Sequence, residues 1–157
     1  MSSISNLAAA GAARDLAAGE VLIAEGEEGG NLYVLESGQL SVERGGVALA
    51  TISQPNALVG EMSMLLARRH SATVRAVGAA RVRTIPDAKA RLLADPELLF
   101  RLAALLAARL EATSAVLVEQ SQANPGKDEQ GLFARIFTAL TSPSEAEIGV
   151  VTRHDLF

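Results

Sequence analysis

The sequence predicts a mainly β fold followed by helices, and two patterns in the chain lead to this prediction. From Gly19 to Ile85, short runs of Val, Leu, Ile and Thr are separated by turn residues such as "GEEGGN" and "SQPNA". One run, "QLSVE", alternates cleanly and places Leu40 and Val42 on one face. From Asp87 onward, the apolar residues recur at the spacing of a helix. Short strands at regular intervals are typical of an antiparallel sandwich or barrel.

These changes in composition divide the 157 residues into four segments. Residues 1–17 are small and Ala-rich and form an N-terminal segment. Residues 18–86 contain the strands, and residues 87–122 contain a short helix and then a long one. Residues 123–157 contain a linker, one more helix and an incomplete tail. A chain of this length fits one domain, or one domain with an appendage.

The segment "GEMSMLLARRHSATVRA", residues 60–76, is the one most suited to binding an anion. Gly60 can adopt backbone conformations that other residues avoid, and "EMSMLL" can form a short helix whose first N–H groups lack partners. Arg69 and His70 can add positive charge, and residues 71–76 form a predicted strand whose small first residues leave room for a ligand. The alternative is a tight turn beside a solvated basic patch.

The long helix has clear start signals. Asp95 suits the N-cap, Pro96 the first helical position, and Glu97 the positive end of the helix. Its leucines form a stripe broad enough to meet a second copy, so we expect a homodimer through the 96–118 helix, as in a coiled coil. The alternative is a helix that packs only on its own domain. The stripe consists of Leu98, Leu102, Leu105, Leu106, Leu110 and Leu117.

Composition excludes several classes of protein. The chain has no cysteine, which rules out disulfides, thiolate metal sites and thiol catalysis. A formal net charge of −4 argues against a surface that binds nucleic acid broadly. The N-terminus lacks the pattern of a secretory signal, and no apolar run is long enough to span a membrane. We therefore expect a cytoplasmic protein that does not contact membranes.

We expect neither enzymatic activity nor a metal or cofactor. His70 and His154 are far apart in sequence, and neither lies in a metal-binding pattern. Ser63 is not in a Gly-x-Ser-x-Gly context. Three glutamates cluster at 25–28, but they lie in a Gly-rich turn, where we expect a solvated loop.

Three stretches, taken in order, resemble the cyclic-nucleotide-binding domain family, and within it the catabolite activator protein and FNR-like regulators. "GEVLIAEGEEGGNLYVLESGQLSV" resembles the first strands, "PNALVGEMSMLLARRHSATVRA" the phosphate-binding cassette, and "DPELLFRLAALLAARLEATS" the long dimerisation helix. The resemblance covers residues 19–114. It implies an eight-stranded jelly-roll barrel, also called a double-stranded β-helix, flanked by a long C-terminal helix.

The resemblance also implies a ligand, cAMP or cGMP, and a role for the cassette residues. Gly60 and Glu61 match the cassette glycine and the glutamate that binds the ribose 2′-hydroxyl. Met62 and Ser63 match the turn whose backbone N–H groups face the cyclic phosphate.

Four further residues match positions of the family's site. Ser71 and Ala72 match the small residues that follow the phosphate-binding arginine. Thr113 and Ser114 match the residues of the long helix that reach the purine, one of them from the partner subunit.

The departure from the family falls at His70, which takes the place of the phosphate-binding arginine. Arginine offers a permanent charge and a bidentate fork, whereas histidine offers fewer donors and titrates near neutral pH. Three interpretations are open. Arg69 replaces the arginine, although it belongs to the other strand face; or His70 binds the phosphate itself, more weakly and with pH dependence; or the pocket takes another ligand or none.

The resemblance thus implies a regulatory sensor that binds a cyclic nucleotide and signals by repacking its C-terminal helices. One alternative is a degenerate fold that serves as a dimerisation or protein-interaction module. Another is a transcription regulator without its DNA-binding part, because "VVTRHDLF" resembles the start of a helix-turn-helix domain. As given, the chain lacks a recognition helix, so we expect no DNA binding by it.

Overall fold

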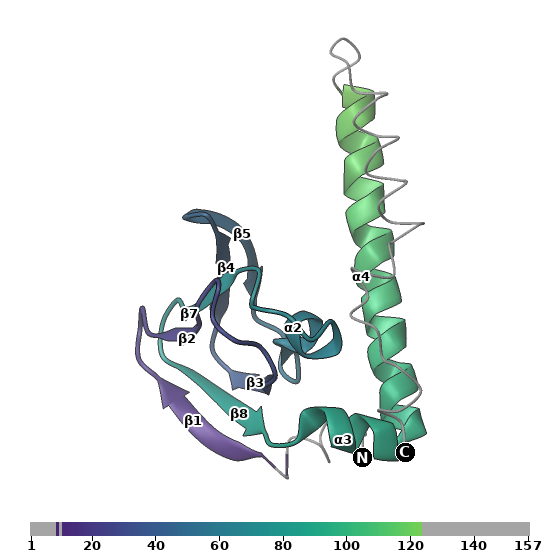
Figure 1. Ribbon diagram of the computed structural model, residues 1–157. Coiled ribbons are helices and arrows are strands. Elements are labelled where there is room, and N and C mark those ends of the chain that lie inside the picture. Colours follow the sequence, from purple (N-terminus) through teal and green to yellow (C-terminus); the bar gives the residue numbers. More distant parts are fainter. Residues whose placement is uncertain (1–8, 10, 124–157) are drawn as a thin grey trace. The chain divides into compact units, whose positions relative to one another are not determined.

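The computed structural model describes residue 9 and residues 11–123, and this part of the chain contains eight strands and three helices (Figure 1). The strands are β1 (Ala12–Leu16), β2 (Val21–Ile23), β3 (Leu32–Ser37), β4 (Leu40–Arg44), β5 (Val47–Ile52), β6 (Leu58–Val59), β7 (Thr73–Ala76) and β8 (Ala80–Ile85). The helices are α2 (Glu61–Leu65), α3 (Ala88–Ala94) and α4 (Pro96–Ala123). The predicted mainly β fold with a long helix after it is confirmed.

The strands form two four-stranded sheets, with the orders β1-β8-β3-β6 and β2-β7-β4-β5. Every pairing is antiparallel, and only β4 and β5 are both neighbours in the sheet and consecutive in the chain. The predicted eight-stranded barrel is not closed in the described part of the chain, where the strands form two separate sheets. Each sheet ends in two edge strands, so backbone hydrogen bonding stays within each sheet instead of passing around a barrel.

A hydrophobic core joins the two sheets, because its buried residues come from strands of both. Alternation explains the arrangement: Leu40 is buried and Val42 is packed against the core, as "QLSVE" predicts. Tyr33 is the one aromatic member, which agrees with the 3% aromatic content. The core residues are Leu16, Leu22, Ile23, Tyr33, Leu35, Leu40, Val59, Val74, Ala76, Ala80 and Val82.

Strand β1 is an edge strand that lies within the Ala-rich N-terminal segment. It pairs with β8 over its whole length, and of its five residues only Leu16 is buried. Polar contacts support this pairing. Arg81 forms an ion pair with Asp15 at 2.8 Å, and Arg83 donates a hydrogen bond to the carbonyl oxygen of Gly11 at 3.1 Å.

Helix α4 begins where the sequence predicts. The backbone N–H of Leu98 donates to Oδ1 of Asp95 at 3.0 Å, which is the expected N-cap hydrogen bond. The chain divides into two compact units, Met1–Leu98 and Leu99–Phe157, so most of α4 belongs to the second. In the described part of the chain, no helix combines the length and apolar character needed to cross a membrane. The linker, helix and tail were predicted for 123–157. Ala123 is instead the last residue of α4, and residues 124–157 lie outside the described part of the chain.

Replacing a core leucine should cost far more stability than replacing an exposed one. Leu35 is 0% exposed and Leu49 is 60% exposed, and both lie in strands. We expect Leu35→Ala to lower the free energy of unfolding by about 2–5 kcal/mol, and Leu49→Ala by less than about 0.5 kcal/mol. Urea denaturation followed by circular dichroism measures both values. Similar losses in the two variants would contradict the position of the core.

Candidate functional site

The turn before α2 is built around a glycine and a buried carboxyl group. Gly60 has φ 90° and ψ 0°, a left-handed conformation that favours glycine, and a Cβ atom there would lie 2.7 Å from the carbonyl oxygen of Asn31. Glu61, the first residue of α2, is only 4% exposed. Burying a carboxylate is costly without compensating polar contacts, so packing alone does not account for a glutamate here.

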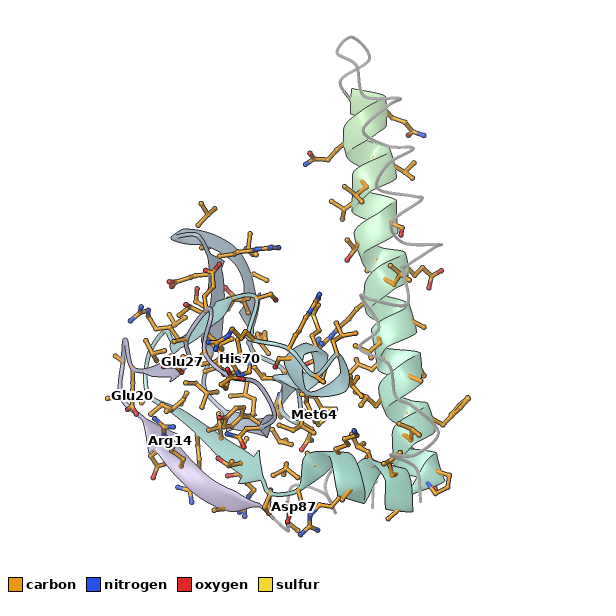
Figure 2. The ribbon with its side chains drawn as sticks, viewed as in Figure 1. Arg14, Glu20, Glu27, Met64, His70 and Asp87 are labelled. Carbon is orange, nitrogen blue, oxygen red and sulfur yellow. The ribbon has the colours of Figure 1, made fainter. Side chains whose placement is uncertain are left out.

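Backbone hydrogen bonds join the segment before β7 to the loop after β2. The N–H of Gly26 donates to the carbonyl oxygen of His70 at 2.8 Å, and the N–H of His70 donates to that of Glu27 at 2.9 Å. Nearby, the N–H of Glu25 donates to Oγ1 of Thr73 at 3.0 Å. These bonds extend the β2–β7 pairing and fix the backbone of His70 against the loop (Figure 2).

The same loop lies directly against α2 through Gly29. A Cβ atom at Gly29 would lie 2.4 Å from the carbonyl oxygen of Arg68 and 2.6 Å from Cβ of Ser63. Contacts this short are sterically impossible, so the close approach requires a glycine. The loop, α2 and the segment before β7 therefore meet around the side chain of Ser63.

Ser63 contacts His70 at this junction of the loop after β2, helix α2 and the segment before β7. Its side chain is 5% exposed, and Oγ lies 2.8 Å from Nδ1 of His70 and 3.0 Å from the carbonyl oxygen of Gly60. Burial lowers the pKa of His70, and the negative charge of Glu27 opposes that shift in part. The imidazole is therefore mainly neutral at pH 7.

Arg69 extends toward the loop. Its Nη1 donates to the carbonyl oxygen of Gly26 at 2.8 Å, and its Nη2 forms an ion pair with Glu28 at 2.6 Å. Both charged side chains are well exposed, so the pair adds little stability. The guanidinium is thus engaged by the loop, and its use for a phosphate would require these contacts to break.

The remaining predicted site residues have different environments. Met62 and Ser71 are exposed, and Ala72 is half-buried. Both small residues precede β7, which begins two residues later than the predicted strand. Thr113 and Ser114 lie on α4, in the second unit, and Oγ1 of Thr113 donates to the carbonyl oxygen of Arg109 at 2.8 Å.

The structure thus gathers one continuous segment, 60–72, with a loop that sequence reasoning did not include. The glutamates at 25–28 are exposed, as predicted, but the loop also supplies the backbone that holds His70. The glycine pair in "GEEGGN" was the available signal, because such glycines often mark a close backbone approach. Among the residues that the structure describes, no group of three or more His, Cys, Asp or Glu side chains could hold a metal ion.

Comparison with known proteins gives a consistent result. The sequence profile described as cyclic nucleotide-binding domain matches residues 13–96, just over half of the chain. No curated protein sequence matches the chain.

Several solved structures are similar to it. The catabolite activator protein of Thermus thermophilus is 30% identical with a TM-score of 0.65, and the match covers 75% of this chain and 58% of that one. The N-terminal domain of a transcriptional regulator from Streptomyces coelicolor A3(2) is 28% identical with a TM-score of 0.54, covering 69% and 82%. The cAMP-bound PfPKA-R (141–441) is 24% identical with a TM-score of 0.57, covering 71% and 38%, a similarity that concerns the fold alone. The chain thus spans 58% of the length of the Thermus protein.

Adding one methyl group at Gly29 should disturb the junction, because it has no space there. We expect Gly29→Ala to lower the free energy of unfolding by about 1–3 kcal/mol. Gly78 provides the matched control: a Cβ atom there meets nothing within 4 Å, and neither glycine has a left-handed φ. Gly78→Ala should change stability by less than about 0.5 kcal/mol. Thermal and urea denaturation compare the two, and equal stability would rule out the close approach at Gly29.

Proposed function

Because the chain belongs to the cyclic nucleotide-binding domain family, we propose that it binds a cyclic nucleotide, cAMP or cGMP, and acts as a regulatory sensor. The observation that carries this proposal is the pairing of left-handed Gly60 with the buried Glu61 at the start of α2. The backbone turn places the Glu61 carboxylate at a position that is only 4% exposed. Such a group can accept hydrogen bonds from the hydroxyl groups of a sugar.

The cyclic phosphate would lie next to the carboxylate. In the first turn of a helix the N–H groups have no carbonyl partner within the helix, which leaves those of Met62 and Ser63 for the phosphate oxygens. His70 would face the phosphate from the segment before β7, and the small residues Ser71 and Ala72 would leave space for it. Thr113 and Ser114 would meet the purine.

The finer description of the fold is part of the same proposal. Pairing of β1 with β8, β2 with β7, β3 with β6 and β4 with β5 supports a jelly roll, because these pairs are nested around one another. The boundaries 18–86 and 87–122, for a strand-bearing segment and a helical one, stay a prediction.

Signalling would proceed through α4 in a homodimer. A second copy would cover some of the large apolar side chains that this helix exposes in the single chain. A ligand that favours one arrangement of the two helices would shift the population between arrangements. These exposed side chains are Leu99, Phe100, Leu110, Val116 and Val118.

Three observations favour a second function, a degenerate fold that serves as an interaction module. His70 replaces the arginine, its pKa is lowered by burial, and Arg69 is held by Glu28. Thermal-shift measurements with cAMP, cGMP and cyclic dinucleotides distinguish the two functions. A ligand at 100 times its Kd stabilises the folded state by about 2.7 kcal/mol, so binding raises the melting temperature. No shift with any nucleotide would favour the interaction module.

Removing the charge of Glu61 should weaken ligand binding. A hydrogen bond to a charged group contributes about 1.5–3 kcal/mol, so we expect Glu61→Gln to raise the Kd for cAMP or cGMP by about 10- to 100-fold. Glu119→Gln, on the exposed surface of α4, makes the same chemical change and should leave the Kd unaltered. Isothermal titration calorimetry gives the values. An unchanged Kd in Glu61→Gln would remove this carboxylate from the site.

A polar substitution on α4 should weaken the homodimer. Leu110 is 44% exposed in the single chain, and burying a leucine contributes about 1.5–3 kcal/mol, so Leu110→Gln should raise the dimer Kd by at least about tenfold. Glu111→Gln is the control, because adjacent residues of a helix face different directions. Sedimentation velocity over a range of protein concentrations measures both. A wild-type protein that stays monomeric would contradict the dimer.

A further inference from the structure

The hydroxyl group of Ser63 has one proton and two polar neighbours. The carbonyl oxygen of Gly60, at 3.0 Å, can only accept a hydrogen bond, whereas Nδ1 of His70, at 2.8 Å, can donate or accept. Both hydrogen bonds form together in one arrangement only. Ser63 donates its proton to Gly60, and Nδ1–H of His70 donates to Oγ of Ser63.

This arrangement determines the tautomer of the neutral imidazole. With its proton on Nδ1, His70 carries a lone pair on Nε2. The structure records no hydrogen bond to Nε2 from any residue that it describes. Nε2 is therefore the nitrogen left for a ligand, and in the neutral ring it is an acceptor. It would repel a phosphate oxygen, and it becomes a donor only when the ring gains a second proton.

We propose that the site takes up one proton together with its cyclic nucleotide, and that His70 accepts this proton at Nε2. The inference rests on the proposed function and specifies its regulation: ligand affinity rises as the pH falls. The proton comes from solvent and remains on the imidazolium, which then donates a charge-assisted hydrogen bond to the phosphate. No covalent bond is made or broken other than the N–H bond.

The charges around His70 fit this coupling. Burial lowers the pKa of the free imidazole, so the ring of His70 is mainly neutral before the ligand arrives, while the charge of Glu27 opposes that shift. On the same segment Arg68 is exposed, and Arg69 is paired with Glu28 on the loop. Glu61 is the acidic residue on α2. A bound phosphate adds a negative charge next to the ring and raises the pKa of His70. Ligand binding is therefore accompanied by proton uptake at pH values between the pKa of the ring in the free protein and its pKa in the complex.

Calorimetry on the full chain tests the proposal directly. Titrations with cAMP and cGMP at pH 6, 7 and 8, each in two buffers of different ionisation enthalpy, give the Kd and the number of protons taken up. A phosphodiester does not titrate in this pH range, so any proton taken up on binding is bound by the protein and not by the ligand. We expect uptake approaching one proton, and a Kd that rises by up to about tenfold for each pH unit.

Two substitutions at His70 distinguish proton uptake from ligand binding. His70→Arg supplies a permanent charge, so it should bind more tightly than the wild type at pH 8 and take up no proton. His70→Gln should bind weakly at every pH without uptake. His154→Gln changes the other histidine of the chain and should leave the uptake at its wild-type value.

Ser63→Ala tests the tautomer. Without the hydroxyl group, the neutral ring can carry its proton on Nε2 and donate to the phosphate, so proton uptake and pH dependence should both decrease while binding persists. Ser53→Ala, at an exposed position directly after β5, is the matched control and should change neither. Circular dichroism establishes that each variant is folded before it is titrated.

The possible outcomes have different meanings. Binding by the wild type without proton uptake, or uptake that persists in His70→Gln, overturns the inference and leaves the proposed function intact. If neither the wild type nor His70→Arg binds a cyclic nucleotide at pH 6, the proposed function fails, and the inference fails with it.

Discussion

The candidate site depends on two backbone hydrogen bonds, which connect His70 to Gly26 and Glu27 across 43 or more residues of sequence. They continue the β2–β7 pairing beyond the ends of both strands. Because they hold the main chain of His70, the imidazole ring lies where it meets Ser63, and Gly29 is brought against α2. Every contact of the junction requires this alignment, so the loop is as much a part of the site as the cassette segment itself.

A histidine at position 70 makes the local positive charge depend on the surroundings of the side chain. An arginine would keep a full positive charge whatever its surroundings, whereas an imidazole in a half-buried position loses its charge to desolvation. The neighbouring Arg69 does not restore a free charge in this segment, because Glu28 neutralises it. Of the basic residues in "ARRH", Arg69 is therefore paired with Glu28, Arg68 is exposed to solvent, and His70 is mainly neutral at pH 7.

Much of the fold could be predicted from the sequence, because turns, alternation and helix caps act locally. Asp95 and "QLSVE" behave as their patterns predict. The pairing of the strands could not be predicted from periodicity, since most partners are far apart in the chain. Strand β1 was missed because alanines are poor strand formers, and pairing with β8 overrides that preference. In the site, the residue types were predictable, but the contacts of Arg69 and Ser63 depend on a loop from another part of the sequence.

The edge position of β1 affects which part of the protein unfolds locally most easily. This strand buries a single leucine, and its other attachments are a ladder to one neighbour and exposed ion pairs such as that between Arg81 and Asp15. Local opening of β1 therefore requires much less free energy than unfolding of the central strand β3, which has four consecutive buried residues. Its amide protons exchange with deuterium before those of β3, and added salt, which screens the ion pairs, widens that difference.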